Sequence, residues 1–554
     1  MSKTDEVDVI VIGSGAGGAP VALTLAEAGA SVVVLEKGPY YTLSDFVHDE
    51  VSIVRRDFWV PWVEDDPHTL RDNPKQRATP TRDGWTSQCV GGATVHMSGF
   101  FYRMKPEDLS LATLTGGIAG STVADWPITL EELLPYYDVM ESRIGVSGQD
   151  GINPYEHRLK PFPLPALRAH PAAKLVDEAA KSLGLHSFPS PRAIASTNVG
   201  SRPPCNLCGF CGDYGCENHS KSSTLATLLP RAERTGHCEI RAKCMVNRIG
   251  TDDRGRARFV EYLDADGRLQ RLNGRAIVLA ASAIESARLL LLSQSNTFPD
   301  GLGNGSGLVG RNLTFSTLGK GTGVFSRDAV MMKVGHSGME LPFLQRSIQD
   351  DYWNPELGFP KGGTYNFILS HPNPIYGALR LVERSNFSLW GEALKTRLKS
   401  YFHDELWLEF EVFGEFLPTP GCFVDLDSQT RDRWGHPVAR INLAHHAASD
   451  RNSSKMVDRG LEVLRAIEPA ALDIYATARA GTTYHLQHGT CRFGHDPATS
   501  VLDPSCQSHE VPNLYVTDGS FMPTSGGVPA TATILANSFR VADLIKARFL
   551  RREL

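Results

Sequence analysis

An uninterrupted run of apolar residues begins at Val9 and stops at Gly13. A β-branched run of this length predicts a parallel strand buried on both faces, and the Ala- and Leu-rich segment 20–28 predicts a helix after it. A second run, residues 30–35, is apolar except for Ser31 and is followed by Glu36. The pattern therefore predicts a strand, a glycine-rich turn, a helix and a second strand that ends in an acid.

This order of elements is typical of a dinucleotide-binding turn. Gly13 permits the tight turn, Gly15 lets the backbone approach a pyrophosphate, and Gly18 lets helix and strand pack closely. Ala16 lies in the same turn and is included in the cofactor site. Glu36 stands about 20 residues beyond the glycines, where a carboxylate accepts hydrogen bonds from ribose hydroxyls. An acid there disfavours a 2′-phosphate, so we expect FAD or NAD and not NADP.

Two later stretches repeat the alternation of strand and helix. Residues 276–281 predict a buried strand, and 283–293 a helix capped near Ser282. Residues 513–519 predict a strand that ends in an Asp-Gly turn, and 532–549 a long helix. The first and last portions of the chain are thus expected to share one open sheet.

Between these portions, residues 320–480 change to a period of two. The runs 406–413 and 421–426 alternate apolar and polar residues, which predicts an antiparallel sheet with one covered face. We expect such a sheet, beside a nucleotide-binding fold, to cover a substrate pocket.

Composition limits the classes of function. The chain has 554 residues, 41% of them hydrophobic, and a net charge of -6, so nucleic acid is excluded as an expected partner. No apolar run approaches the length of a membrane span, and the N-terminus has no signal-peptide pattern. We expect a cytoplasmic protein, with export alongside a partner subunit left open.

The cysteines are unevenly distributed. Cys205, Cys208, Cys211 and Cys216 follow the spacing C-x2-C-x2-C-x4-C, and short spacings of this kind let several thiolates converge on one metal or iron–sulfur cluster. The alternative is a compact loop of reduced or disulfide-paired cysteines that braces the segment 221–224. The sequence leaves both open.

A set of motifs in order along the chain resembles the glucose-methanol-choline (GMC) oxidoreductases, a family of FAD-dependent alcohol dehydrogenases and oxidases. Besides the first glycine turn, the motifs lie in segments 91–96, 125–128, 279–286, 308–313, 489–494 and 515–524. The resemblance implies an α/β fold with a Rossmann-type FAD-binding domain (1–115, 200–320 and 480–554) and an inserted antiparallel-sheet substrate domain (116–199 and 321–479). It also adds these residues to the FAD site: Gly91, Gly92, Thr94, His96, Ala281, Asp518 and Gly519.

The resemblance implies that a histidine removes the hydroxyl proton of an alcohol while hydride passes to flavin N5. The family places this base three residues before Gly489, where this chain has Leu486, with His485 and His488 on either side. A one-residue bulge would bring His485 into place, and a different loop path would bring His488. The family's second His or Asn falls on Pro529, so the other histidine, Thr531 or a residue of the middle sheet must complete the pair.

The cysteine segment is most similar to sugar and sugar-acid dehydrogenases such as gluconate 2-dehydrogenase, which implies polyhydroxylated substrates. We therefore expect oxidation of a CH-OH group of a sugar, polyol, glycoside or aminoglycoside-like compound, with oxygen, a quinone or a cytochrome as electron acceptor. The alternatives are a hydrophobic alcohol such as a long-chain alcohol or sterol, a flavoprotein subunit of a membrane electron-transfer complex, and a non-catalytic FAD-binding protein. Some relatives join FAD covalently through a histidine at the place of His96; a hydrogen-bonded loop histidine is the reading we favour.

Overall fold

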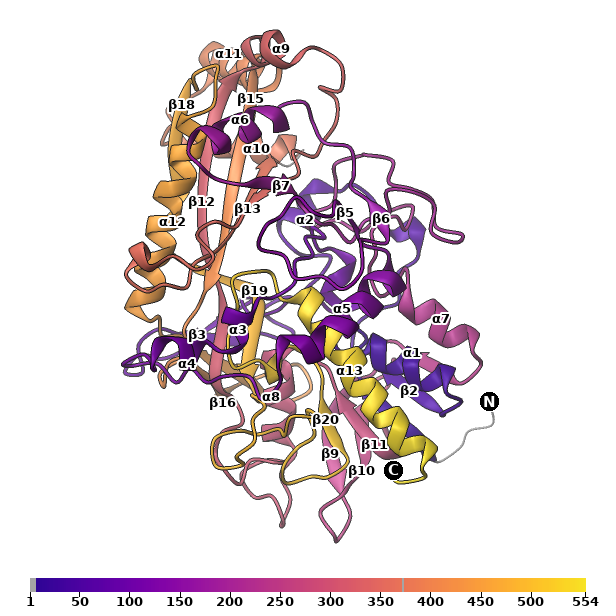
Figure 1. Cartoon of the computed structure of the whole chain (residues 1–554). Helices are drawn as coiled ribbons and strands as arrows, with labels where there is room; N and C mark the ends of the chain where they lie inside the picture. Colours follow the sequence, from indigo (N-terminus) through magenta and orange to yellow (C-terminus); the bar gives the residue numbers. More distant parts are fainter. Residues whose placement is uncertain (1–5, 371–372) are drawn as a thin grey trace.

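The computed structural model describes residues 6–370 and 373–554. Residues 1–5, at which we expect no signal sequence, lie outside the described residues. Two large sheets dominate the described part, and Figure 1 shows the long strands of the second sheet extending away from the layers built on the first.

The first sheet contains the predicted dinucleotide-binding unit. Strand β1 (Glu6–Ile12) lies parallel to β2 (Val32–Leu35) on one side and to β11 (Leu269–Leu279) on the other. Strand β20 (Leu514–Val516) also pairs in parallel with β11, so the first and last portions of the chain do share one sheet, as predicted. The remaining strands are β8 (Cys238–Arg241), β9 (Met245–Thr251) and β10 (Ala257–Leu263).

Helices cover this sheet. Helix α1 (Ala19–Glu27) has Pro20 in its first turn and is followed by Gly29, whose φ of +86° belongs to the left-handed region. Helix α13 (Thr531–Leu550) packs against α1 and against α5 (Leu130–Ile144). Helix α8 (Ala283–Leu292) begins after Ser282, as predicted, although the Ser282 side chain makes no capping hydrogen bond. Helix α7 (Leu228–Arg234) completes the cover beside β8.

The second sheet is antiparallel, as the period of two predicts. Its longest strands are β12 (Arg311–Ser326) and β15 (Glu405–Glu415), and helix α12 (Ala447–Arg465) lies along them in Figure 1. The other strands are β7 (Ser187–Pro189), β13 (Arg346–Ile348), β14 (Gly363–Leu369), β18 (Asp473–Ala478) and β19 (Thr482–Thr490). Together, the two sheets and their helices confirm the predicted fold class.

The prediction for residues 421–426 is wrong in one respect. These residues enter β16 (Phe423–Arg431), which belongs to a separate sheet with β17 (Pro437–Asn442), β3 (His68–Arg71) and β4 (Thr79–Thr81). Strand β17 pairs in parallel with β3, from a distant part of the chain. An alternating pattern shows that one face is covered, but it does not say which strands are its neighbours.

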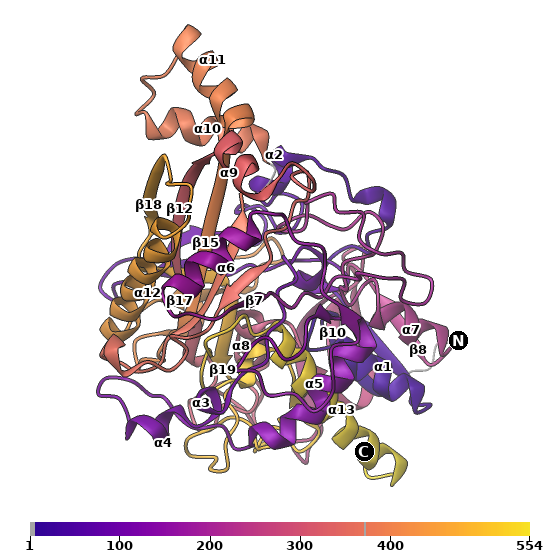
Figure 2. The ribbon, with the colours of Figure 1, turned by 45° about the horizontal axis from the view of Figure 1, so that its top comes forward.

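Smaller helices complete the structure. Helices α10 (Pro374–Arg384) and α11 (Gly391–Lys399) project from the body in Figure 2. The others are α2 (Glu50–Val54), α3 (Pro106–Leu109), α4 (Leu111–Thr115), α6 (Ala173–Ser182) and α9 (Arg327–Val334). Within the described ranges, every helix is too short or too polar to cross a lipid bilayer.

Candidate active site

A cavity of about 750 Å³ opens at the carboxyl ends of β1, β2 and β11 and reaches the second sheet. Ligands of open α/β sheets bind at this edge, where strands feed into helix N-termini. Twelve of the fourteen residues predicted for the catalytic and cofactor sites line it: Gly13, Gly15, Ala16, Glu36, Gly92, Thr94, His96, Ala281, His485, His488, Asp518 and Gly519. The other two, Gly18 and Gly91, lie beside the wall and shape it.

The first glycine turn is closely packed wherever it does not face the cavity. A Cβ on Gly13 would lie 2.3 Å from the carbonyl oxygen of Ala280, and one on Gly18 would lie 2.0 Å from the carbonyl oxygen of Gly13. A Cβ on Gly15 would meet nothing closer than Gly92 Cα at 3.7 Å. Gly15 is therefore free of a side chain where a ligand's phosphates would approach the backbone.

The second glycine loop is joined to the first. The N–H of Gly91, whose φ is +96°, donates to Ser14 Oγ over 2.9 Å. This loop contains a short 3-10 turn at Gly92–Val95, and Thr94 Oγ1 donates back to the Gly91 carbonyl over 2.7 Å. The two turns together form one continuous wall of backbone.

Glu36 has a defined set of partners at the end of β2. Its carboxylate accepts hydrogen bonds from Ser14 N–H (3.1 Å), Ser14 Oγ (2.6 Å) and Gly38 N–H (3.0 Å), and burial raises its pKa. Glu36 also lines the cavity. A ribose hydroxyl bound at this side of the cavity would meet its carboxylate.

The two candidate histidines occupy different environments on β19. Phe315 of β12 pairs with Gln487 and the next residue, Ser316, pairs with Thr483, so residues 484–486 form a bulge without partners on β12. His485 in the bulge is exposed to the cavity, whereas His488 returns to the ladder opposite Thr314 and is 1% exposed. A bulge of this kind redirects a side chain into a site.

Both histidines are held neutral. Burial in the protein wall, then the nearby Arg56 guanidinium, lowers the pKa of His485 to about 4, while the Asp213 carboxylate opposes this change. Burial alone lowers the pKa of His488 to about 3, and its Nδ1 has no hydrogen-bond partner. A neutral imidazole at pH 7 is the form that accepts a proton.

The His96 ring is fixed from two sides. Its Nε2 lies 3.0 Å from the Thr86 carbonyl oxygen, and its ring stacks on Trp59 with 4.9 Å between centroids. Burial, followed by the charge of Lys221, lowers its pKa to about 3.

Sequence reasoning missed the charged part of the cavity wall. On β15, Glu409, Glu411 and Phe413 face the cavity, while the alternate residues join the core beneath α12. Lys320 of β12 lies directly opposite Glu411 and forms an ion pair with it over 2.6 Å. Arg56 and Asp213 also line the cavity. The period of two predicts which strand positions share a face, but not that this face is polar and meets the cofactor site.

The cysteine segment forms a loop, and Asp213 of this loop lines the cavity. The loop is held by Lys221, a buried lysine whose Nζ donates to the carbonyl oxygens of Cys211 and Tyr214, each over 2.6 Å. All ten cysteines are free thiols. Of the two forms considered for a compact cysteine loop, reduced or disulfide-paired, the structure has the reduced one. The four clustered cysteines line a second cavity of about 10 Å³.

Comparison with known proteins gives the family. Two GMC oxidoreductase models match residues 123–317 and 418–538, and an FAD-binding-domain model matches 8–45. The chain is 31% identical over 554 residues to the 2-methyl-1,2-propanediol dehydrogenase of Mycolicibacterium austroafricanum, covering 99% of this chain and 96% of that one. This chain belongs to the GMC oxidoreductase family.

Other GMC relatives differ in their named substrates. The paromamine 6′-oxidase of Streptomyces fradiae is 31% identical (98% of this chain, 92% of that one), and the gluconate 2-dehydrogenase flavoprotein of Pantoea cypripedii is 27% identical (99% and 95%). A solved formate oxidase of Aspergillus oryzae RIB40 has the same fold, with a TM-score of 0.67, 15% identity and 98% of each chain covered. This GMC protein is an FAD-dependent oxidoreductase that acts on CH-OH groups.

The residues of this GMC chain fit FAD. The backbone wall at Gly15 and Gly92 leaves room for a pyrophosphate, Glu36 lines the cavity where a ribose would lie, and the cavity continues from there to His485. At the far end, Asp518 is fixed by Ser520 N–H over 2.8 Å. A Cβ on Gly519 would lie 2.6 Å from the carbonyl oxygen of Gln487, so the turn and β19 meet closely.

Proposed function

We propose that this enzyme oxidises a CH-OH group of a polyhydroxylated compound (a sugar, polyol, glycoside or aminoglycoside-like molecule) to the carbonyl, with His485 as the base. The single observation that carries the proposal is the cavity wall beyond the glycine turns, where Arg56, Asp213, Lys320, Glu409 and Glu411 gather. A hydrophobic alcohol would exclude water from these charged groups and offer them no hydrogen bonds in exchange, which is unfavourable.

His485 is favoured over His488 because a base must contact the hydroxyl whose proton it removes. Both side chains line the cavity, but His485 stands in the bulge and is exposed, whereas His488 pairs with Thr314 of β12 and is 1% exposed. Arg56 lines the same cavity as His485, and we propose that its guanidinium binds the oxygen as it gains negative charge. The family uses a second His or Asn to bind this oxygen, and Pro529, which stands at that position here, has no side-chain donor. Arg56 would supply the missing donor.

When bound, FAD supplies the acceptor for the two electrons and the hydrogen that leave the carbon. His485 takes the hydroxyl proton and later releases it. Asp213, Lys320 and the two glutamates of β15 hydrogen-bond the remaining hydroxyl or amino groups and so orient one carbon toward the cofactor. This orientation is what makes the oxidation regioselective.

We infer that FAD is held without a covalent bond. Nε2 of His96 faces the Thr86 carbonyl, and the ring is stacked on Trp59. Denaturation in acid followed by filtration tests this inference: all of the flavin should pass the filter, and flavin retained with the protein would contradict it.

An electron-relay role remains the second candidate, because the four clustered thiols surround one small cavity. An iron–sulfur cluster there would pass electrons to a quinone or cytochrome. Iron and acid-labile sulfide in the purified protein, with absorbance near 400 nm beyond the flavin bands, would support this role.

An anaerobic substrate screen tests the proposal. Sugars, polyols and aminoglycosides are mixed with the oxidised holoenzyme, and bleaching of the flavin band near 450 nm is recorded. We expect bleaching by members of this set. Bleaching only by long-chain alcohols or sterols would overturn the substrate class, and no bleaching by any alcohol would favour a non-catalytic FAD-binding protein.

A further inference from the structure

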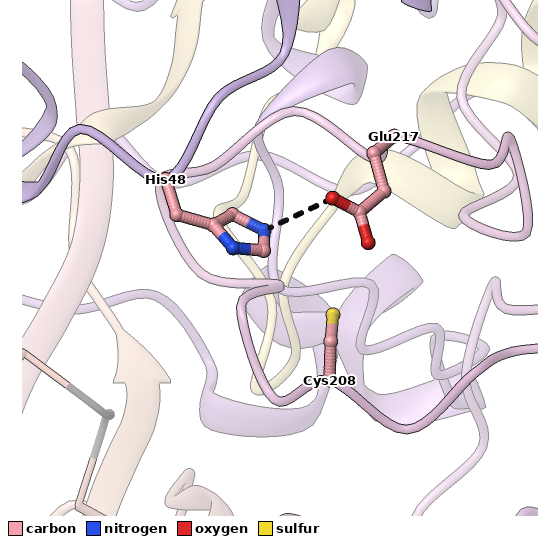
Figure 3. Close-up of side chains that lie close together, drawn as sticks. All are labelled: His48, Cys208 and Glu217. Carbon is pink, nitrogen blue, oxygen red and sulfur yellow. Dashed lines mark ion pairs between the residues drawn. The ribbon is translucent and has the colours of Figure 1, made fainter.

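A group of three side chains with different ligand atoms meets at the outer end of the cysteine loop (Figure 3). His48 comes from the segment before α2, and Cys208 and Glu217 come from the cysteine loop. One ligand atom of each lies within 4.8 Å of the others, and His48 Nε2 is 3.6 Å from a Glu217 carboxylate oxygen. Ligand atoms on one tetrahedral zinc ion, with bonds of about 2.0–2.3 Å, are roughly 3.3–3.8 Å apart. The distance between His48 and Glu217 falls in this range, and the 4.8 Å limit for the three atoms exceeds it by about 1 Å.

The three side chains are oriented by neighbours that are not themselves ligands. The His48 ring stacks on Phe210 with 3.9 Å between centroids. The Asn206 side chain donates to the other oxygen of Glu217 over 3.1 Å, and its own oxygen accepts from the Cys208 N–H over 3.3 Å. Partners of this kind fix the ligands of metal sites in proteins.

The space between the side chains suits a single ion. His48, Cys208 and Glu217 all line the cavity of about 10 Å³, which is about the volume occupied by one water-sized probe. The His48 and Glu217 side chains are 31% and 42% exposed, so water has access to a fourth coordination position. A thiolate and a carboxylate would balance the charge of a divalent cation.

We propose that His48, Cys208 and Glu217 form a binding site for one divalent zinc ion, with water as the fourth ligand. Imidazole, thiolate and carboxylate are the ligand types that zinc accepts together. The site differs from an iron–sulfur cluster on the four cysteines, because it uses one cysteine and two residues outside that set.

The position of the site connects it to the active-site cavity. His48 precedes α2, after which the chain places Arg56 in the cavity, and Cys208 and Glu217 flank Asp213, which also lines it. An ion bound at these three residues would tie together the two segments that supply charge beside His485. Binding of the ion can be measured without any alcohol oxidation, so this proposal and the proposed function can fail separately.

The test is zinc binding by the holoenzyme. Protein stripped with a chelator is titrated with zinc against a chromophoric indicator, bound metal is measured by mass spectrometry, and melting is followed with and without zinc. We expect one zinc per chain and a rise in Tm on zinc addition. His48→Ala and Glu217→Gln should each weaken binding by at least 100-fold, and Asn206→Ala by about 10–100-fold.

Matched controls separate this site from the alternatives. Cys205→Ser changes a thiol of the same loop, and His403→Ala removes an exposed histidine elsewhere; both should bind zinc like the wild type. Because the His48 and Glu217 side chains are partly exposed, their variants are expected to keep the wild-type circular dichroism and flavin content. No tight zinc, or undiminished zinc in His48→Ala, would overturn the proposal. Iron and sulfide lost equally in Cys205→Ser and Cys208→Ser would overturn it in favour of a cluster.

Discussion

The backbone N–H of Asp213 donates to the carbonyl oxygen of His96 over 2.9 Å. This bond joins the cysteine loop to the second glycine loop, and Trp59 Nε1 holds the same loop through the Asp213 carbonyl oxygen over 2.5 Å. Because both bonds use the backbone of Asp213, its carboxylate is free to face the cavity. The loop is therefore part of the active-site wall.

Asp213→Asn tests this role, since the backbone bonds should survive. Loss of one hydrogen bond from a charged group, about 1.5–3 kcal/mol, predicts a rise in KM for the polyol of at least about 10-fold. Steady-state kinetics at saturating acceptor measures it, and flavin content reports whether the loop is intact. An unchanged KM would place the carboxylate outside the substrate site.

The pH dependence of flavin reduction should follow the lowered pKa of His485, about 4. A protonated imidazole accepts no proton, so the rate should stay level from neutral pH to about pH 5 and fall below about pH 4, whereas an ordinary histidine near 6.5 would lose activity from pH 7 downward. Arg56→Gln removes a charge that lowers this pKa, so its acidic limb should move to higher pH. An acidic limb at the same pH in Arg56→Gln and wild type would show that the Arg56 charge does not affect the pKa of His485.

Two glycines of the first turn offer a matched pair. Gly18→Ala places a Cβ 2.0 Å from the Gly13 carbonyl oxygen, so we expect little folded protein. Gly15→Ala meets no atom closer than 3.7 Å, so the variant should fold but bind FAD more weakly. Expression yield, circular dichroism and flavin-to-protein ratio distinguish the two, and full flavin occupancy in Gly15→Ala would contradict the assigned phosphate approach.

The glutamates of β15 distinguish amino-bearing from neutral substrates. If Glu409 receives an ammonium group, Glu409→Gln should raise KM for an aminoglycoside by roughly 10-fold, from about 1.5 kcal/mol, and leave a neutral sugar unchanged. Lys320→Met is the companion variant, since it leaves Glu411 without its cation. Equal effects on both substrate types would indicate a structural role for Glu409.

The first sheet follows from its sequence because each element carries its own signal: the apolar run into Gly13, the helix before Gly29 and the acid at Glu36. The candidate site follows only in part. The bulge at residues 484–486 depends on how β19 pairs with β12, which local propensity does not determine. Likewise, Arg56 and Asp213 reach the cavity that His485 lines only through tertiary packing, so only the structure associates them. The domain boundaries stay a prediction.

The assignment of His485 as the base has one most direct measurement. Oxidised wild-type, His485→Ala and His488→Ala enzymes are mixed anaerobically with a polyol substrate, and the rate of loss of the 450 nm band is recorded at saturation. Removal of a general base predicts a fall of about 10²–10⁴-fold for His485→Ala with flavin still bound. His488→Ala, when folded and flavin-loaded, should reduce its flavin within a few-fold of the wild-type rate. A large loss in His488→Ala together with a near-normal rate in His485→Ala would contradict the account.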